Sequence, residues 1–533
     1  MIFGMIKSKW QNKSDPTYFA GDIDRIRAHY EFRRDSALDE FFIDDITWHD
    51  LSMDEVFKKI NPQRTTSGEQ YLYYLLRSLT LKEDEYEKRR KLIEFIEKNP
   101  GLRAKLEKAF MRLGRFRDAK LHETFVASGR GKWRLILYIF LVLSLLVAII
   151  LAPLLNSFIL VLTATSLLIL NPIIHYFALK AVKPKLDTVN YLALIVSTAK
   201  KMKKVATPEF DIHFPNFSKS MHRLQAVHHI GGVPRSGNAK NEEEFIFTIV
   251  MSNLLLIDLI LYEWIESKLE KHYQDIFNLH EIIGALDASM AIVSYRESLT
   301  YFSLPNINFD KNAAPSLQIA DVAHPLVKNP VVNSIDTNIP TLLTGSNASG
   351  KSTFLKSITL NIIMAQSICT VLATDYTAPA FYTYSSMAIA DNLLAGDSYF
   401  VAEIKSAKRI IDNLSTHHPV FCVIDEVLRG TNTIERVSAS SELLKLIAQK
   451  GALCFAATHD IELCELLKKD YQMLHFTETI TEAGEVIFDY KVRTGPATTR
   501  NAIKLLDALG FDKGLVKSAN TRASLYSESG KWR

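Results

Sequence analysis

Several features are scarce in this sequence of 533 residues. It contains 4 cysteines and no CxxC spacing, and Cys422 and Cys454 lie in apolar runs typical of strands, which excludes a disulfide scaffold and favours reduced thiols. We find no internal repeat or low-complexity tract, and no secretory signal, because Lys7, Lys9 and Lys13 follow the first apolar residues at once. The charge is nearly balanced, with 63 Lys and Arg against 59 Asp and Glu, so it does not by itself indicate a nucleic-acid binder.

Long apolar runs, in contrast, are present. The mean hydropathy of +0.03 is high for a chain with 23% charged residues, and the excess lies between Trp133 and Leu179. Residues 135–155 and 157–178 contain no Asp, Glu, Lys or Arg. About 20 apolar residues suffice for a helix to cross a bilayer, so the sequence predicts a transmembrane helical hairpin over 132–180, with spans at about 135–155 and 157–178.

Basic residues flank both ends of this hairpin: Arg130, Lys132 and Arg134 before it, and Lys180, Lys183 and Lys185 after it. Positive flanks stay in the cytoplasm, so we expect a cytoplasmic-membrane protein with two spans and cytoplasmic N- and C-terminal domains. The alternative is a helical hairpin buried in a large soluble domain. A third apolar stretch, Phe245 to Tyr262, carries a central Asp258, which costs about 2.5–3.5 kcal/mol on insertion scales, and we interpret it as a core helix of the soluble domain.

The pattern of apolar residues divides the remaining chain into further regions. Residues 1–131 and 181–310 have helical periodicity, whereas from 311 to 495 short apolar strands alternate with helices, a pattern typical of an α/β domain with a parallel sheet. Residues 496–533 are predicted to form a helical tail. The predicted fold is therefore an α/β domain with a parallel sheet, preceded by an all-α domain that the hairpin interrupts.

A glycine-rich loop carries the strongest chemical signal. The stretch TGSNASGKST, Thr344 to Thr353, matches GxxxxGK[ST] and lies between an apolar strand and a helical run, as a phosphate-binding P-loop requires. Its backbone N–H groups would face phosphate oxygens, Lys351 would reach the β- and γ-phosphates, and Ser352 would ligate Mg²⁺. The candidate ATP-binding residues are Gly345, Ser346, Asn347, Ala348, Ser349, Gly350, Lys351, Ser352 and Thr353.

Two later strands end in polar residues. Asp425 and Glu426 close an apolar run, at the strand end where ligands of α/β sheets bind; Asp425 would hold Mg²⁺ and Glu426 would polarise the attacking water. His459 closes another such strand and would sense the γ-phosphate or place water, although a single histidine is more often a hydrogen-bonded structural residue. Glu426, His459 and Lys351 are the candidate catalytic residues. Between these motifs, Ser398 precedes a predicted helix over 401–414, and the residues alone favour a helix cap there.

Taken in order, TGSNASGKST, DSYFVAE, CVIDEVLRGTNTIER and AATHD resemble the ATPase domain of the MutS mismatch-repair family, closely over about 320–510 and loosely over about 35–310. Ala323 to Val327 resembles the family segment that leads into the nucleotide-binding strand, while Thr65 to Glu69 and Glu281 to Ser289 look like parts of its helical core. The resemblance implies that the α/β domain is a P-loop ATPase domain with an ABC-like parallel sheet and that the all-α domain before it is a core or lever domain. It also implies ATP and Mg²⁺ as cofactors, ATP hydrolysis, and a homodimer with composite sites in which Ser398 contacts the partner's γ-phosphate.

The resemblance also implies DNA as a partner, but two departures put mismatch recognition in doubt: no room for a mismatch-reading domain precedes residue 35, and the predicted spans stand where relatives carry a DNA clamp. Two basic clusters beside the hairpin would bind DNA or, as we favour, anionic membrane lipid; they are Arg112, Arg115, Arg117 and Lys120, and Lys200, Lys201, Lys203 and Lys204. A membrane-anchored assembly or motor ATPase without a nucleic-acid substrate is the alternative function. A transporter is disfavoured because DSYFVAE stands where an LSGGQ-like signature belongs.

Overall fold

The computed structural model describes residues 18, 21–35, 40–62, 64–116, 133–205, 208–224, 250–346, 349–387, 399–414, 418–428, 431–480, 486–497, 503, 506–507 and 510–529. These residues form two compact units. The first comprises Met1–Leu38, Asn61–Tyr74 and Lys91–Val293, and the second Asp39–Ile60, Leu75–Arg90 and Ser294–Arg533. Two pieces of the predicted N-terminal helical region, Asp39–Ile60 and Leu75–Arg90, thus group with the α/β part of the chain.

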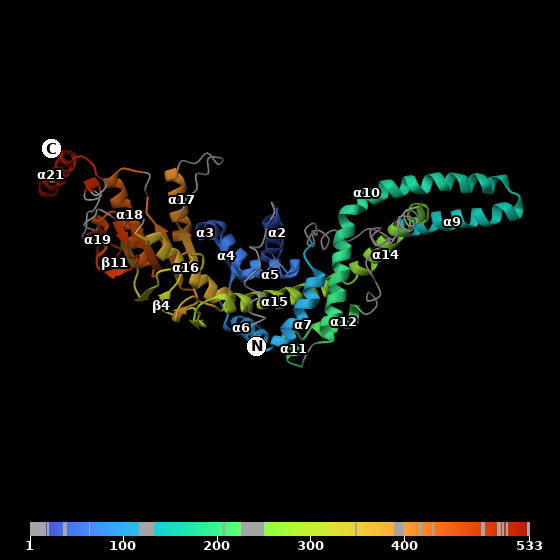
Figure 1. The fold of residues 1–533 in the computed structure, drawn as a ribbon, viewed down its shortest axis with the longest axis horizontal. Coiled ribbons are helices and arrows are strands. Elements are labelled where there is room, and N and C mark those ends of the chain that lie inside the picture. The colour runs from blue at the N-terminus through green and yellow to red at the C-terminus, as the bar shows by residue number, and fades with distance from the viewer. Residues whose placement is uncertain are drawn as a thin grey trace. The chain divides into compact units, whose positions relative to one another are not determined.

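The first unit is helical in its described residues (Figure 1). Its helices are α2 (Asp22–Arg34), the start of α5 (Thr66–Arg77), the end of α6 (Glu83–Lys98), α7 (Pro100–Leu113), α9 (Trp133–Leu155), α10 (Phe158–Lys203), α11 (Pro208–His213), α12 (Phe217–Arg223), α14 (Ile257–Glu270) and most of α15 (Tyr273–Ser298). The α5 and α15 backbones approach closely, because a Cβ on Gly68 would lie 2.2 Å from Asp287 Oδ2 and one on Gly284 would lie 2.8 Å from the Ser67 carbonyl oxygen. The two segments expected to form the helical core therefore pack against each other.

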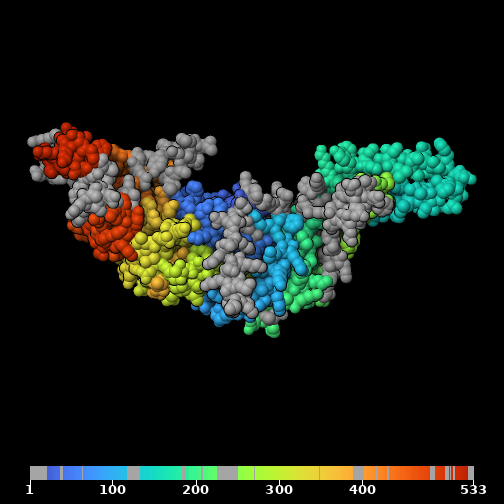
Figure 2. Space-filling model, in the orientation of Figure 1, coloured from blue at the N-terminus to red at the C-terminus, as the bar shows by residue number. Residues whose placement is uncertain are grey.

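Helices α9 and α10 form the predicted hairpin and meet at Asn156, which has a positive φ of 43°. Three described helices are long and apolar enough to cross a membrane, by length and composition alone: α9, the first part of α10 over Phe158–Val182, and α15. The hairpin helices expose large apolar side chains along their length, visible as the teal surface in Figure 2. Helix α10 also continues well past the predicted end of the second span, as far as Lys203.

The third apolar stretch packs against the hairpin. Of Phe245 to Tyr262, the part from residue 250 is described, and there Leu256 and Leu259 are buried and pack against Tyr138 of α9. Helix α14, which contains the end of this stretch, is not among the described helices long and apolar enough to cross a membrane, as the sequence predicted. Asn171 of α10 donates a 2.9 Å hydrogen bond to the Leu254 carbonyl, where the helix breaks at Leu256 (φ 49°). His175 Nε2 lies 3.8 Å from Asp258. A hydropathy scale treats the polar groups of this stretch as unfavourable, although the Leu254 carbonyl and Asp258 have partners on α10 of the hairpin.

One prediction about the basic residues beside the hairpin is wrong, namely that Arg115 contacts lipid or DNA. Arg115 is largely buried, and it forms ion pairs with Glu69 and Asp22 inside the first unit. Glu69 is fully buried, and this burial raises its pKa to about 7, although Arg115 and Arg25 act in the opposite direction. Arg115 is therefore a structural residue and not a contact for lipid or DNA. Arg117 and Lys120 lie outside the described residues.

The second unit contains a six-stranded sheet in the order β14-β11-β6-β10-β9-β8. Its strands are β6 (Thr341–Thr344), β8 (Tyr382–Ser386), β9 (Val420–Asp425), β10 (Leu453–Thr458), β11 (Gln472–His475) and β14 (Arg493–Thr494). All neighbours pair in parallel except the edge strand β14, which is antiparallel to β11. The expected parallel sheet is therefore present. Its flanking helices include α16 (Lys351–Ile368), α17 (Tyr399–Asp412), α18 (Thr433–Gln449) and α19 (Glu462–Leu467).

Smaller elements complete this unit. A mixed sheet has the order β3-β7-β4-β5, from β3 (Asn306–Asn308), β4 (Leu317–Val322), β5 (Asn333–Thr337) and β7 (Asp375–Pro379). The remaining elements are β1 (Phe41–Phe42), β2 (Ser78–Leu79), α3 (Asp45–Asp50), α4 (Met53–Ile60), the hairpin of β12 (Glu478–Ile480) and β13 (Val486–Phe488), and α21 (Lys513–Ser529). Helix α21 occupies the predicted helical tail.

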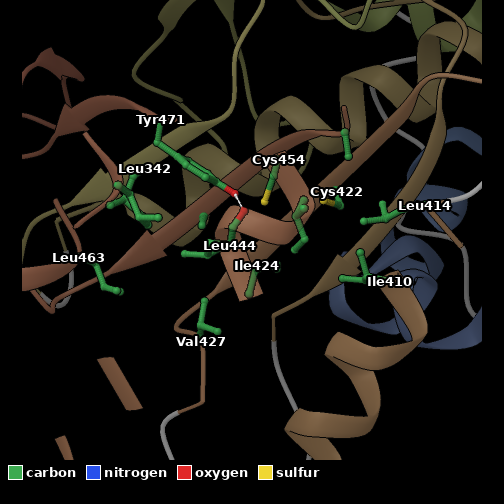
Figure 3. Close-up of a cluster of buried hydrophobic side chains, with 14 of the residues drawn as sticks. Leu342, Ile410, Leu414, Cys422, Ile424, Val427, Leu444, Cys454, Leu463 and Tyr471 are labelled. Atoms are coloured by element: carbon green, nitrogen blue, oxygen red, sulfur yellow. Dashed lines mark hydrogen bonds between the residues drawn. The ribbon is translucent and has the colours of Figure 1, made fainter. Parts of the chain in front are cut away.

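One apolar core fixes the central strands against α17 and α18 (Figure 3). The side chains of Cys422 and Cys454 stand in register on β9 and β10, and all four cysteines are free and buried. Tyr471 closes this core, and its hydroxyl donates a 2.9 Å hydrogen bond to the Leu444 carbonyl. Strands buried on both faces explain the near-continuous apolar runs that end at Asp425 and Thr458.

Candidate nucleotide-binding site

The candidate site lies at the carboxyl edge of the six-stranded sheet. Parallel register places Thr344 opposite Thr458, and Ala457 opposite Asp425. The glycine-rich loop after β6, the Asp-Glu pair at the end of β9 and His459 after β10 therefore emerge side by side. The sequence predicted this convergence from the strand ends alone.

The loop after β6 has the backbone that its glycines allow. Gly345 (φ 144°) and Gly350 (φ 107°) adopt conformations that favour glycine. A Cβ on Gly345 would lie 2.8 Å from the Phe476 carbonyl oxygen, and one on Gly350 would lie 3.2 Å from the Tyr490 ring. Both positions therefore demand glycine for conformation and for space. Asn347 and Ala348 lie outside the described residues.

Lys351 is the first residue of α16, and its side chain turns back over the loop. Its Nζ donates hydrogen bonds to the carbonyl oxygens of Gly345 (2.7 Å) and Ser346 (2.8 Å). A buried ammonium that is held by two carbonyls at a helix N-terminus provides a fixed positive charge where an anion would sit. Ser349 is buried in the same loop, while Ser352 and Thr353 follow Lys351 on the first turn of α16.

Ser352 and Asp425 meet directly, since the Ser352 hydroxyl donates a hydrogen bond to Asp425 Oδ2. This pair brings a hydroxyl oxygen and a carboxylate together, the oxygen ligands that Mg²⁺ prefers. Both residues were predicted as metal ligands from separate motifs, so their contact is the sharpest geometric agreement in the site.

Glu426 and His459 form the other expected pair. Glu426 is a non-glycine residue in the left-handed region (φ 62°), and its N–H donates to the Ala457 carbonyl at 2.9 Å. His459 Nδ1 lies 3.4 Å from Glu426 Oε1. Arg436 of α18 fixes the loop that carries His459, through two hydrogen bonds to Asp460 of 2.6 and 2.8 Å. The left-handed backbone of Glu426 is strained, and the Glu426 carboxylate lies beside His459, on the loop after β10.

A cleft of about 610 Å³ opens beside these residues. Its lining includes the motif residues Ser346, Gly350, Lys351, Ser352, Thr353 and Glu426, but not Asp425 or His459. Other lining residues were not assigned to the site by the motifs. They include His324, Val327, Asn329, Val331, Asn333, Phe476 and Tyr490. Burial lowers the pKa of His324 to about 4, with smaller contributions from Lys356 and Lys59, so its imidazole is neutral near pH 7.

Sequence reasoning found part of this second wall. It noted Ala323 to Val327, and also Tyr490 to Val492, as segments similar to the family, but gave neither His324 nor Tyr490 a place in the site, and it missed Phe476. Asn333 Nδ2 donates a 3.0 Å hydrogen bond to the Tyr490 carbonyl and so links two residues of this wall. Glu478 was also missed, although its carboxylate accepts a 2.8 Å hydrogen bond from Ser346. Ser398 and its segment lie outside the described residues.

Fold and site together define an α/β domain of the ATPase class, with a loop, a carboxylate pair and a histidine gathered at one sheet edge. Residues 341–526 match the family model described as MutS domain V. The chain is also similar to proteins named DNA mismatch repair protein MutS: 30% identical over 272 residues in Lactobacillus delbrueckii, covering 49% of this chain and 31% of that one, and 28% identical over 296 residues in Fusobacterium nucleatum, covering 53% and 32%.

The chain is therefore similar to the MutS family over its C-terminal α/β part. It spans about a third of the length of the curated relatives that it matches. Domain V is the ATPase region of that family, and this agrees with the α/β fold and the site described above.

Proposed function

We propose that this chain binds ATP in the cleft beside the glycine-rich loop and hydrolyses it to ADP and phosphate. The observation that carries the proposal is the convergence of Lys351, the Ser352–Asp425 pair and the Glu426–His459 pair at one sheet edge. The glycine-rich loop would act as a P-loop, with the helix N-terminus and Lys351 compensating phosphate charge. Glu426 would orient and polarise the attacking water, with His459 beside it.

The Ser352–Asp425 pair fits a Mg²⁺ ion that arrives with the nucleotide. When bound, Mg²⁺ would neutralise charge on the β- and γ-phosphates. The aromatic and aliphatic wall of Val331, Phe476 and Tyr490 offers the nucleoside an apolar surface on the other side of the cleft.

Two variants test this assignment. Lys351→Ala should abolish nucleotide binding, whereas Glu426→Gln should retain ATP and lower hydrolysis by about 10²- to 10⁴-fold, because only the general base is lost. The matched controls are Lys445→Ala and Glu442→Gln, which remove an exposed pair on α18 remote from the motifs. Binding is measured with a fluorescent ATP analogue and turnover by phosphate release. Normal turnover by Glu426→Gln would refute its role as base.

We further propose that the chain acts as a homodimer with composite ATP sites, in which Ser398 reaches the partner's γ-phosphate. This step rests on the similarity to the MutS family. It predicts that turnover per chain rises with protein concentration and that Ser398→Arg lowers turnover without lowering ATP binding. Turnover independent of concentration, in a monomer at every concentration, would exclude a composite site.

We propose α9 and the first part of α10 as a membrane anchor of two spans, with the rest of the chain in the cytoplasm. Support comes from the exposure of their apolar side chains, since only 22% and 11% of their most apolar windows are buried. An apolar surface of this extent is unusual for a protein surrounded by water.

DNA is the proposed partner, because the relatives that share domain V are named as mismatch-repair proteins. Binding should weaken steeply with salt if phosphates are engaged. The purified dimer, titrated with duplex DNA with and without ATP at several salt concentrations, tests this point. The absence of salt-dependent binding would remove DNA and leave a membrane-anchored assembly ATPase.

A further inference from the structure

A cluster of three ligand-type side chains, two buried and one half-buried, is formed by α2 and α15 of the first unit. It consists of His29 from α2 and of His280 and Glu281 from α15. Each side chain offers one nitrogen or oxygen atom, and these three atoms lie within 4.8 Å of one another. His29 and His280 are 3% and 2% exposed, so water reaches neither ring freely.

The three facing atoms lack hydrogen bonds. His29 Nε2, His280 Nε2 and Glu281 Oε1 are buried, and none makes a hydrogen bond to any residue that the structure describes. His29 Nε2 and Glu281 Oε1 lie 3.3 Å apart, within ion-pair distance, so they partly compensate each other, whereas His280 Nε2 has no such contact among the described residues. A buried polar atom without a hydrogen bond costs about 1–3 kcal/mol, so a ligand common to all three atoms would relieve this cost.

Hydrogen bonds from neighbouring residues orient the side chains of His280 and Glu281. His280 Nδ1 lies 2.8 Å from the Ser67 hydroxyl, which lies 2.8 Å from the Tyr191 hydroxyl. An Nδ1–H that donates to Ser67 leaves Nε2 of His280 as a lone-pair acceptor aimed into the cluster. Arg33, one turn after His29 on α2, donates a hydrogen bond to Glu281 Oε2 and leaves Oε1 to face the two histidines. Outer partners of this kind orient the ligands in known metal sites.

We propose that His29, His280 and Glu281 bind a transition-metal ion, with Zn²⁺ as the best-fitting ion. Two imidazole nitrogens and one carboxylate oxygen form a three-ligand set that leaves a fourth position open. Imidazole ligands suit Zn²⁺, Fe²⁺, Ni²⁺ and Cu²⁺ rather than Mg²⁺ or Ca²⁺, whose preferred ligands are all oxygen. The site is separate from the nucleotide cleft in sequence and in chemistry, so it does not depend on the proposed ATPase activity.

The site would tie α2 to α15 within the helical unit. The two helices are joined by contacts of Arg33 with Glu281 and by the ring contact of His29 with His280, whose centroids are 5.2 Å apart. A bound ion would add a direct link between residues far apart in the chain. Metal binding of this kind favours the folded over the unfolded state.

The test uses the full chain in detergent micelles, purified through an affinity tag without histidine, stripped with a chelator and exchanged into ZnCl₂ without nucleotide. We expect about one Zn²⁺ per chain by elemental analysis after gel filtration. His280→Gln should lose that ion, and Ser67→Ala should weaken binding by about 10- to 100-fold, because Ser67 orients the His280 ring. His222→Gln, which removes an exposed histidine of α12, and Asp425→Asn should retain it.

A second measurement keeps the test valid if a variant misfolds. Co²⁺ added to the stripped wild-type chain should give the intense visible absorption of a four-coordinate site with nitrogen ligands, and Zn²⁺ should abolish it. Zn²⁺ should also raise the melting temperature of the wild-type chain and of His222→Gln but not of His280→Gln. Equal Zn²⁺ content in the wild-type chain and His280→Gln, or a Co²⁺ spectrum of the hydrated ion alone, would overturn the proposal.

Discussion

Helix α15 and the hairpin helices α9 and α10 look alike in the sequence but differ in surroundings. All three are long and apolar enough to span a bilayer. Yet 83% of the most apolar window of α15 is buried inside the protein, against 22% for α9 and 11% for α10. Length and hydropathy therefore identify the helices that can span a membrane, whereas exposure separates those with a protein environment from those without one.

The side chains explain this difference. Helix α15 carries His280, Glu281 and Asp287, and each of them meets a polar or charged partner from another segment of the first unit. Its small residues, such as Gly284, allow the backbone of α5 to approach. The hairpin instead exposes large apolar residues, Leu143 and Ile150 among them. A helix that packs in a protein core mixes small and paired polar residues, whereas α9 and the first part of α10 present mainly large apolar side chains at their surface.

The largest expected effect is on topology. Ser157→Cys places a thiol at the turn between α9 and α10, where the membrane proposal puts the far face of the bilayer. In intact cells a membrane-impermeant maleimide should label this variant fully and leave Asn312→Cys, in the exposed part of the second unit, unlabelled until the cells are opened. The four native cysteines are buried and give little background. Labelling of both variants only after lysis would restore the buried soluble hairpin.

The next largest expected effect is the difference between a charge placed in α15 and a charge placed in α9. Ala291 of α15 is 2% exposed, so Ala291→Asp buries an unpaired carboxylate and should destabilise the first unit by about 3–5 kcal/mol. Leu143 of α9 is 54% exposed, and Leu143→Asp should leave the melting temperature in detergent nearly unchanged. The same change should oppose membrane insertion by about 2.5–3.5 kcal/mol.

Thermal unfolding in detergent and a glycosylation-based insertion assay measure these two effects separately. The control is Leu143→Ala, which removes apolar area without adding a charge. If Leu143→Asp unfolds the chain in detergent as Ala291→Asp does, then the outer face of α9 is packed against protein, and the comparison of the two helices fails.

Much of the fold follows from the sequence, because parallel strands buried on both faces leave continuous apolar runs. The runs that end at Asp425 and Thr458 became β9 and β10, and the uncharged runs became α9 and the start of α10. The packing of the third apolar stretch against the hairpin was not predicted, because its polar partners Asn171 and His175 lie far away in the sequence. The role of Arg115 was missed for the same reason, since its partners are Asp22 and Glu69.

The candidate nucleotide site also has a part that the sequence predicts and a part that it does not. Its motif residues are short-range features, so the meeting of Ser352 with Asp425 and of Glu426 with His459 was predictable from strand order. The opposite wall is assembled from Val331, Phe476 and Tyr490, ordinary apolar and aromatic residues that reach the cleft only through tertiary packing. The His29–His280–Glu281 cluster is hidden in the same way, because one of its ligands lies far from the other two along the chain.

The smallest expected effect concerns how the hairpin holds the third apolar stretch. Asn171 is fully buried in α10 and donates to the Leu254 carbonyl, so Asn171→Leu leaves that carbonyl without its donor. Hydrogen bonds between membrane helices contribute about 0.6 kcal/mol on average, with a maximum near 1.7, so we expect a loss in this range. Thr163→Val is the control, because Thr163 bonds only within its own helix, to the Ile159 carbonyl, among the described contacts. Unfolding by a denaturing detergent measures both variants. Equal losses would mean that the Asn171 bond does not anchor the segment, whereas a loss confined to Asn171→Leu would mean that the hairpin holds the third apolar stretch through this bond.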